Sequence, residues 1–294
     1  MSDTLTSLRR KIDSAGDLQS VVRTMKALAA SSIGQYERST AALSDYALTV
    51  ELGLSVCLRR AELQGQRAEQ QQPAAVDLVN AVVFGSDQGL VGMFNEAVAD
   101  HALATLAELP GKARVWAVGE RVLARLADAG LELAGVFAVP GSVEAIAPLV
   151  GQILVQSEAS VKPGEATELH LFYNRPASES GYAPVAHRLL PLDRAWWREL
   201  AEYPWPTKNL PEVLGSSQTL RALIREHLFI SLFRACAESL ASENASRLTA
   251  MERADKNIDE LLDGLNNSFH RLRQSNIDEE LFDVIAGYEA LAKE

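Results

Sequence analysis

The stretch ASENASRLTAMERADKNIDELLDGLNNSFHRL, residues 241–272, decides the architecture of this chain. Its apolar residues recur at alternating steps of three and four, the spacing of a coiled-coil seam. They are Ala241, Ala245, Leu248, Met251, Ala254, Ile258, Leu261, Leu265, Phe269 and Leu272. The stretch belongs to a proline-free segment from Glu212 to Glu294 that follows the last proline, Pro211. One helix of that length would reach about 125 Å, whereas a compact domain of this chain's size has a radius of gyration of about 19 Å. Most of the helix is therefore expected to project beyond any globular body.

A second proline-free stretch runs from Met1 to roughly Gln72 and also has a helical pattern. Its apolar stripe consists of Leu5, Leu8, Ile12, Ala15, Leu18, Val22, Met25 and Leu28. An antiparallel coiled coil of the two terminal segments is the simplest way to bury both stripes, because both segments re-enter the same middle body from their inner ends. We therefore predict an N-terminal coiled-coil helix over 1–72, an α/β domain over 73–211 and a C-terminal coiled-coil helix over 212–294.

The pattern changes in the middle segment. The apolar run from Val79 to Phe84 ends at Gly85 and is typical of a buried strand. Helical and strand-like runs then alternate, with helices expected over 93–109, 120–129 and 143–158 and strands over 113–118 and 132–139. Such alternation favours a Rossmann-like, mainly parallel sheet with helices on its faces. Two further strand-like runs, 167–173 and 183–190, are expected to add an antiparallel edge, and 196–211 is expected to be an irregular connector.

Composition and charge argue against several classes of protein. With 47% hydrophobic and 23% charged residues, the chain is typical of a soluble protein. Its net charge of -11 argues against a nucleic-acid partner, which the short basic runs Arg9-Arg10-Lys11 and Arg59-Arg60 do not reverse. We find no unbroken run of about 18 apolar residues and no secretory signal, so no membrane insertion is expected. Cys57 and Cys236 fall in predicted helices and are expected to be unpaired core thiols.

The sequence carries no recognisable catalytic motif. The turn GSDQGLVG, residues 85–92, follows a strand and precedes a helix, where phosphate-binding loops lie. It lacks the lysine of a P-loop and the GxGxxG spacing, so a structural turn is favoured over nucleotide binding. The histidines are scattered without metal-ligand spacing. We expect no catalytic residue, cofactor or metal.

Two alternative hypotheses remain open for the function of the chain. One is a nucleotide-binding α/β enzyme with helical extensions, and the other is a coiled-coil adapter.

Two features of the last helix indicate a protein partner. Arg247 and the pair Arg273-Gln274 could make directional contacts with an acidic surface, since a guanidinium can bridge a carboxylate with two bonds, although a charge on a long helix is most often a solvated one. The last turns, 284–291, are unusually apolar for a free end and are expected to fit a receiving pocket.

Short motifs are spread over the whole chain in a fixed order. They are LRRKI at 8–12, TMK at 24–26, AAS at 29–31, SDQGL at 86–90, LFYN at 171–174, LLPL at 189–192, SENASRLTAM at 242–251 and RQSNI at 273–277, followed by Gly287 and Leu291. Each is weak alone, but their order and spacing resemble the gamma subunit of the F-type rotary ATP synthase.

The resemblance implies an architecture and a set of partners. The paired terminal helices would form the axle inside a ring of alpha and beta subunits, three of each. The α/β domain would be the foot near the membrane c-ring, where it would also meet the epsilon subunit. The chain would be a non-catalytic central rotor shaft that couples ion flow through the membrane ring to ATP synthesis or hydrolysis. It would lie at the cytoplasmic face of the bacterial inner membrane as part of the complex.

The resemblance also implies roles for particular residues. It places Arg247, Arg273 and Gln274 against acidic loops of the beta subunit, with Met25 facing the same region. It places Ile285, Tyr288 and Leu291 in an apolar tip that turns as a bearing in the sleeve of the ring. Asp278 and His270 stand where the family usually has threonine and asparagine, so the chain is expected to be a divergent member.

Overall fold

The computed structural model describes residues 4–63, 76–159, 165–178, 181–209 and 216–291. The chain divides into two compact units. The α/β unit is Ala30–Arg247, and the helical unit combines Met1–Ala29 with Leu248–Glu294. Two long helices, α1 (Leu5–Leu63) and α6 (Ser216–Leu291), contribute to both units. The end of the predicted N-terminal helix, residues 64–72, lies outside the described residues.

The α/β unit contains a five-stranded sheet in the order β3-β2-β1-β4-β5. Strand β1 (Leu78–Phe84) pairs in parallel with β2 (Lys112–Val118) and with β4 (Thr167–Ala177), and β3 (Leu133–Phe137) pairs in parallel with β2. Strand β5 (Gly181–Leu190) is antiparallel to β4. The predicted parallel sheet and its antiparallel edge are both confirmed.

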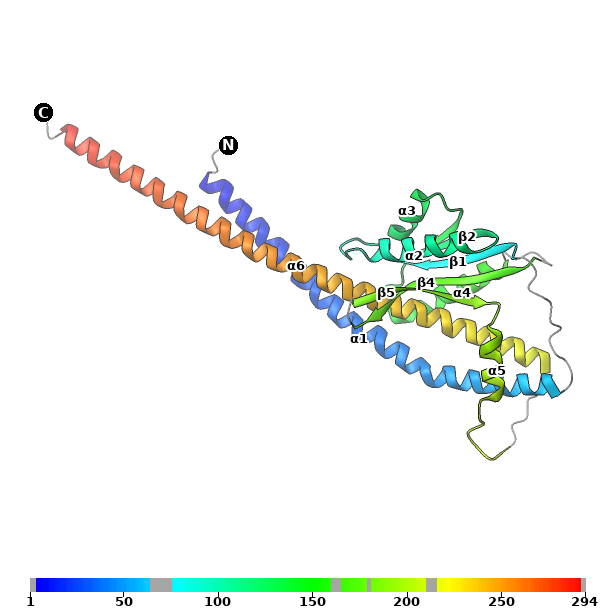
Figure 1. The fold of residues 1–294 in the computed structure, drawn as a ribbon. Helices are drawn as coiled ribbons and strands as arrows, with labels where there is room; N and C mark the ends of the chain where they lie inside the picture. Colours follow the sequence, from blue (N-terminus) through cyan, green and yellow to red (C-terminus); the bar gives the residue numbers. More distant parts are fainter. Residues whose placement is uncertain (1–3, 64–75, 160–164, 179–180, 210–215, 292–294) are drawn as a thin grey trace. The chain divides into compact units, whose positions relative to one another are not determined.

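Helices cover both faces of this sheet (Figure 1). Helices α2 (Phe94–Glu108) and α3 (Glu120–Asp128) pack on one face, where the core consists mainly of valine, alanine and leucine. The other face packs against α4 (Ile146–Ala159), which follows a short 3-10 turn at Val143–Ala145, and against residues 228–241 of α6.

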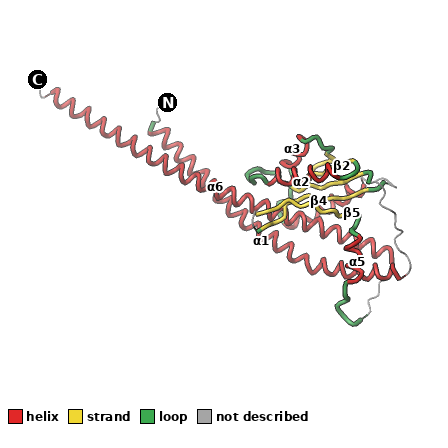
Figure 2. The backbone as a smooth tube through the Cα atoms, viewed as in Figure 1, coloured by secondary structure: helices red, strands yellow, loops and turns green. Residues whose placement is uncertain are grey.

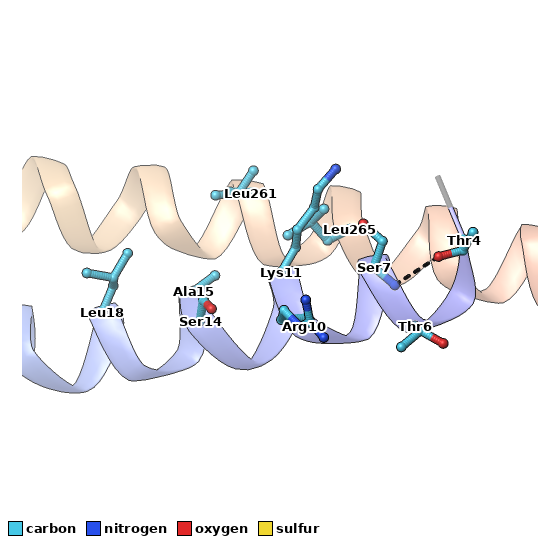
Figure 3. Close-up of a pocket in the computed structure, with 10 residues that line it drawn as sticks. All are labelled: Thr4, Thr6, Ser7, Arg10, Lys11, Ser14, Ala15, Leu18, Leu261 and Leu265. Carbon is cyan, nitrogen blue, oxygen red and sulfur yellow. Dashed lines mark hydrogen bonds between the residues drawn. The ribbon is translucent and has the colours of Figure 1, made fainter. Parts of the chain in front are cut away.

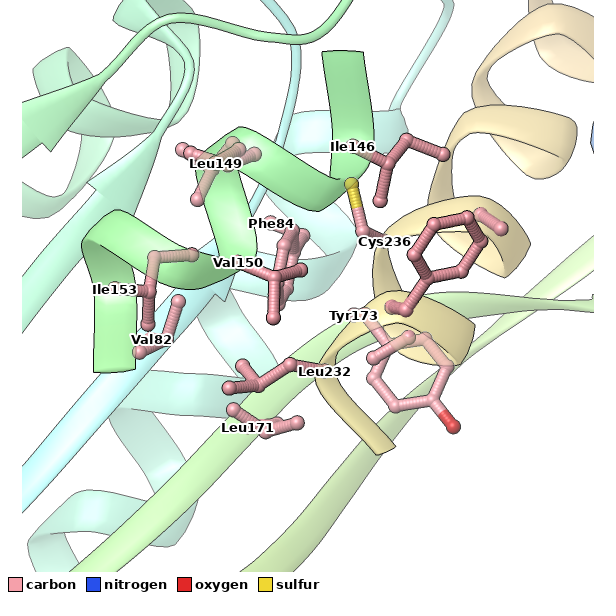
Figure 4. Packing of buried hydrophobic residues seen from close by; sticks show 14 of the residues in the cluster. Val82, Phe84, Ile146, Leu149, Val150, Ile153, Leu171, Tyr173, Leu232 and Cys236 are labelled. Atoms are coloured by element: carbon pink, nitrogen blue, oxygen red, sulfur yellow. The ribbon is translucent and has the colours of Figure 1, made fainter. Parts of the chain in front are cut away.

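The core on the second face joins two strands and two helices (Figure 4). Phe84 of β1 and Leu171 of β4 pack with Val150 of α4 and with Leu232 and Cys236 of α6. Phe84 is 2% exposed and Leu171 and Leu232 are fully buried. Burying one such side chain contributes about 1.5–3 kcal/mol, so this face supplies much of the unit's stability. Cys236 is a free, buried thiol, as predicted, and Cys57 is buried as well.

One expectation was wrong, because the segment predicted to be an irregular connector from Trp196 begins as a helix. Helix α5 (Arg194–Glu202) starts at Asp193, whose side chain accepts a hydrogen bond from the Ala195 N–H at 2.9 Å. At its other end Arg59 of α1 donates to the Ala201 carbonyl at 2.6 Å and to the Tyr203 carbonyl. The contacts that hold this helix come from a distant part of the chain, which the sequence pattern does not reveal.

An apolar cluster also holds α5 in place. Leu200 packs with α1 and α6 residues in a separate small core. Its buried members are Ala47, Val50, Leu54, Leu58, Leu200 and Ile230. Trp196 and Trp197, the first residues of the predicted connector, pack against the edge of this cluster. Burial of the aromatic rings therefore favours a docked helix.

The helical unit is an antiparallel pair formed by the first turns of α1 and the last part of α6 (Figure 2). Arg23 of α1 bonds Asp255 of α6 at 3.1 Å, and Gln19, further toward the N-terminus, bonds Asp259, further toward the C-terminus. This opposite progression of partners confirms the predicted antiparallel pairing. Leu8 and Met251 are 3% and 2% exposed, so part of the predicted seam is buried. Leu18, Leu28 and Leu261, which were also predicted to lie in the two stripes, are 60%, 63% and 53% exposed, so the prediction was wrong for these three residues.

Helix α1 contains one stretch that is apolar enough to cross a membrane by length and composition. An 18-residue window within Leu5–Arg59 has a mean hydropathy of 1.4, and 33% of it is buried inside the structure. The window is interrupted by polar residues, so it is not an unbroken apolar run and was not predicted from the sequence. The same composition is found in core helices of soluble proteins, and Val50 and Leu54 of α1 are buried against α5 and α6.

Candidate functional site

The turn at residues 85–92 is built from contacts within the protein. A Cβ atom at Gly85 would lie 2.4 Å from Cβ of Val122, so glycine is needed for β1 to approach α3 closely. The Asp87 carboxylate accepts hydrogen bonds from the Glu120 N–H at 3.0 Å and the Val139 N–H at 2.9 Å. Asp87 therefore joins the chain after β1 to the start of α3 and to the chain after β3.

This arrangement occupies the place where an anion would bind. Ligands of open α/β sheets bind outside the carboxyl ends of the strands, and phosphates bind to free N–H groups at helix N-termini. Here the Glu120 N–H, at the start of α3, already meets the Asp87 carboxylate, and the Ser86 N–H donates to Asn95 Oδ1 at 2.9 Å. The geometry favours the structural-turn interpretation over the nucleotide-binding alternative.

The same loop also bonds to the last helix. Ser246 of α6 donates a hydrogen bond from its hydroxyl to the Val91 carbonyl. Asn174 of β4 donates to the Phe94 carbonyl at 2.9 Å. Three of the motifs noted in the sequence, SDQGL, LFYN and SENASR, thus meet around one loop. Within the turn at residues 85–92, Leu90 has a left-handed backbone conformation with a φ of 64°, and it is 62% exposed.

Next to this loop lies a buried ion pair on α6. Arg247 Nη2 is 2.7 Å from Glu243 Oε1, and the two side chains are 14% and 6% exposed. Burial raises the pKa of the Glu243 carboxyl, and the neighbouring Arg247 guanidinium opposes that rise. Burial likewise raises the pKa of the Tyr36 hydroxyl, with the Glu243 charge adding to the effect.

A cavity of about 230 Å³ opens beside this pair. It is lined by Tyr36 of α1, by Asp87 and Gln88 of the turn, and by Glu243 and Arg247 of α6, among others. The sequence marked Arg247 as a candidate contact residue. It did not indicate that Glu243 would hold it, although their i,i+4 spacing on a helix is the one visible signal.

The other predicted contact residues lie in the helical unit. Met25 is half-buried on α1, while Arg273 and Gln274 are exposed on α6. Because Arg23 pairs with Asp255, Arg273 lies about 27 Å further along α6 from the level of Arg23, at about 1.5 Å per residue. The structure therefore does not bring Met25 and Arg273 together.

The predicted bearing tip is described only in part. Ile285 is 45% exposed on α6. Tyr288 and Leu291 belong to the helix, but their side chains lie outside the described residues. Further exposed apolar side chains precede them, of which Phe282 and Val284 are 68% and 70% exposed.

A second, larger cavity in the helical unit was not expected from the sequence. It has a volume of about 650 Å³ and lies between the first turns of α1 and the leucines Leu261 and Leu265 of α6 (Figure 3). Arg10 and Lys11 line it together with hydroxyl side chains. Leu261 is 53% exposed, so the seam leaves apolar surface uncovered here. Among the described parts of the chain, no cluster of three or more histidine, cysteine or acidic side chains could hold a metal ion.

The amino-acid sequence matches a known protein family. The ATP synthase family model matches residues 4–291. The chain is 28% identical over 309 residues to the ATP synthase gamma chain of Mycolicibacterium paratuberculosis, covering 99% of both proteins. It is 29% identical over 296 residues to the ATP synthase gamma chain of Granulibacter bethesdensis, covering 98% of this chain and 99% of that one.

Solved structures share the fold. The rotor of the Euglena gracilis mitochondrial ATP synthase in rotational state 1 matches with a TM-score of 0.63 and 14% identity, over 93% of this chain and 98% of that chain. The central stalk and c-ring structure of the Tetrahymena thermophila mitochondrial ATP synthase matches with a TM-score of 0.54 and 22% identity, over 80% of this chain and 99% of that one. The family match over almost the whole chain, together with the paired terminal helices and the intervening α/β unit, shows that this chain belongs to the ATP synthase gamma-chain family.

Proposed function

We propose that this chain is the non-catalytic central shaft of an F-type ATP synthase. The observation that carries the proposal is the alignment of the entire chain, both terminal helices included, with ATP synthase gamma chains. The antiparallel helix pair supplies a stiff element, and the Asp87 carboxylate occupies the turn where a nucleotide phosphate would bind. The shaft couples ion flow through the membrane ring to ATP synthesis or hydrolysis elsewhere in the complex.

The partners follow from this role. The shaft stands inside a ring of three alpha and three beta subunits, and its α/β segment meets the epsilon subunit and the c-ring. An asymmetric helix pair presents a different surface to each beta subunit, so chemically identical catalytic sites favour different nucleotide states. The complex is membrane-associated, and we place this chain at the cytoplasmic face of a bacterial inner membrane. The working segments are the helix over 1–72, the foot over 73–211 and the helix over 212–294.

Contact residues are proposed on both units. Arg273 and Gln274 are exposed, which leaves them free to bond acidic loops of the beta subunit. Met25 and Arg247 are further beta-subunit contacts. Tyr288 and Leu291 join Ile285 in the apolar tip, where the lack of directional bonds lets the helix slip within its sleeve.

The first test uses the whole chain and its assembly. The isolated chain should hydrolyse no ATP, and mixing it with alpha and beta subunits should give a complex that contains one copy. Hydrolysis by the isolated, pure chain would contradict the proposal.

The second test changes one proposed contact. Arg273→Ala should leave the fold intact, because an exposed arginine contributes little to stability. Ion pumping per ATP in reconstituted vesicles should fall, because a contact between shaft and ring that contributes about 1 kcal/mol is lost. Arg271→Ala, an exposed arginine on the same helix, is the matched control. Equal effects of the two variants would refute the role of Arg273.

A further inference from the structure

The end of α6 reaches beyond the start of α1 (Figure 1). Arg23 of α1 bonds Asp255 of α6, and the two helices are antiparallel. Leu5, the first residue of α1, comes eighteen positions before Arg23. It therefore lies level with Arg273, eighteen positions after Asp255. The segment 274–286 of α6, which we call the tail, has no described residue of α1 beside it.

The tail has one apolar face, and that face is exposed. Its members recur at helical spacing and are 45–70% exposed, and they are Ile277, Leu281, Val284 and Ile285. Asp278 lies at the edge of this face, because it precedes Ile285 by about two helical turns. The Asp278 carboxylate is exposed and forms no ion pair with any described residue. A helix owes most of its stability to the packing of its apolar face, so the tail requires a partner surface.

The cavity of about 650 Å³ between α1 and α6 has the complementary chemistry (Figure 3). Its apolar wall includes Leu18, Leu261 and Leu265, of which the first two are 60% and 53% exposed. Arg10 and Lys11 supply positive charge, and none of the described residues that line the cavity is acidic. The exposed Arg10 guanidinium forms no ion pair with any described residue. The cavity therefore suits a segment that combines apolar side chains with a carboxylate.

Two copies of the chain can bring tail and cavity together about a two-fold axis. With the axis at Arg273, each α6 residue lies level with the residue of the second copy that is equally far from Arg273 on the other side. Leu281 follows Arg273 by eight positions, and Leu265 precedes it by eight. Ile285 and Leu261 are each twelve positions away, on opposite sides. The apolar face of the tail therefore lies level with the apolar wall of the other copy's cavity.

The same axis also matches the charges. Asp278 follows Arg273 by five positions, and Arg10 follows Leu5 by five. Because Leu5 is level with Arg273 and α1 is antiparallel to α6, Arg10 lies level with Asp278 of the second copy. One position of the axis thus satisfies the apolar match and the charge match together. Two-fold symmetry then repeats both matches on the other side.

We propose that the cavity between α1 and α6 binds the tail of a second copy, so that the free chain forms a two-fold dimer. The apolar face of the tail packs on Leu261 and Leu265, and the Asp278 carboxylate accepts hydrogen bonds from the Arg10 guanidinium. Each chain carries a net charge of -11, which opposes association, so these local contacts determine whether the copies pair. The dimer depends on surfaces of the helical unit alone and is independent of the shaft function. A ring of partner subunits would compete for the tail, so the dimer is a state of the chain without partners.

Sedimentation equilibrium of the full-length chain measures the dimer over a range of concentrations. Arg10→Glu and Asp278→Arg should each weaken it at least about tenfold, because each change acts at two symmetry-related contacts. The two changes together should restore the affinity, since the ion pair forms again with its charges exchanged. Arg9→Glu and Glu279→Arg are the matched controls, because they make the same charge changes at exposed positions outside the cavity and outside the apolar face. They should alter the affinity by no more than about twofold.

A disulfide tests the position of the axis. Ser14 lines the cavity and lies level with Phe282 of the second copy, because Ser14 follows Leu5 by nine positions and Phe282 follows Arg273 by nine. Within one chain the two positions lie about 27 Å apart along the helices, whereas a disulfide joins Cα atoms less than about 7 Å apart. Ser14→Cys combined with Phe282→Cys should therefore give a covalent dimer on a non-reducing gel after oxidation. Either change alone should not, because the two equivalent thiols of the dimer lie about 27 Å apart and the natural cysteines are buried.

Several results would overturn the proposal. A chain that stays monomeric at every concentration would do so, and would leave the cavity to a different partner. A dimer that Arg9→Glu weakens as much as Arg10→Glu, a double charge variant that does not regain affinity, or a double cysteine variant that does not cross-link would do so as well. All the changes are at exposed positions, and circular dichroism checks that each variant folds.

Discussion

Replacing Asp87 with alanine should destabilise the α/β unit more than any other single exchange of a half-exposed carboxylate in its loops. The substitution removes the acceptor of two backbone N–H groups, those of Glu120 at 3.0 Å and Val139 at 2.9 Å. These bonds hold together the chain that leaves β1, the start of α3 and the chain that leaves β3. Losing them frees three loops at one edge of the sheet.

The magnitude follows from the number and exposure of the bonds. A hydrogen bond to a charged group contributes about 1.5–3 kcal/mol, but water can partly replace a half-exposed carboxylate. We therefore expect Asp87→Ala to cost about 2–3 kcal/mol of unfolding free energy. For a unit of this size each kcal/mol lowers Tm by about 2–4 °C, so the shift should be about 5–10 °C.

Urea and thermal unfolding of the full chain measure the effect, with circular dichroism as the signal. Asp77→Ala is the matched control, because Asp77 accepts one backbone hydrogen bond, from the Ala166 N–H at 3.1 Å. It should cost about 1 kcal/mol or less. Asp87→Asn retains one acceptor oxygen and should fall between the two. If Asp87→Ala costs no more than Asp77→Ala, the assigned role of Asp87 as the link between the three loops is wrong.

Three further outcomes are expected. Burial lowers the pKa of His227 to about 4, so the unfolded chain binds more protons between about pH 6.5 and pH 4, and stability should fall by about 2 kcal/mol as pH drops through that window. Urea titrations at pH 7 and pH 4.5 measure this loss, which His227→Gln should reduce; an unchanged loss would contradict it. Gly85→Ala should cost about 2–4 kcal/mol, because the new methyl group would lie 2.4 Å from Val122, and unfolding near that of the parent chain would count against it. A double-mutant cycle on Arg23 and Asp255, followed by thermal unfolding, should give a coupling of about 0.5 kcal/mol, and a value above 2 kcal/mol would show that this exposed pair is more important than its geometry indicates.

Much of the fold could be predicted because it is encoded in local periodicity. The alternating runs after Gly85 gave the parallel strands and their helices, and the stripes of α1 and α6 gave the antiparallel pair. Helix α5 could not be predicted in the same way, because its end is held by Arg59, far away in the sequence.

Less of the candidate site than of the fold could be predicted from the sequence. The sequence marks Arg247 as a charge on a helix, but the cavity that it lines with Glu243 also includes Tyr36 and the turn after β1, and these come together only in the folded unit. The missing lysine predicts a structural turn, and the structure adds the cause, because the Asp87 carboxylate already bonds the N–H at the start of α3. The roles of Met25, Arg273 and Gln274 stay predictions, since they concern surfaces that face other polypeptides.

The enclosure of residues 228–241 of α6 has a mechanical consequence. Leu232 and Ala237 are fully buried, and Ala235 and Cys236 are 2% and 1% exposed. This part of the helix is therefore packed on most of its surface against strands and neighbouring helices. Twisting it about its own axis would drive leucine and phenylalanine side chains out of close-packed positions, and interiors of this density resist such movement. This part of α6 and the sheet should therefore rotate together as one rigid body, and a torque applied to the helix is transmitted to the sheet.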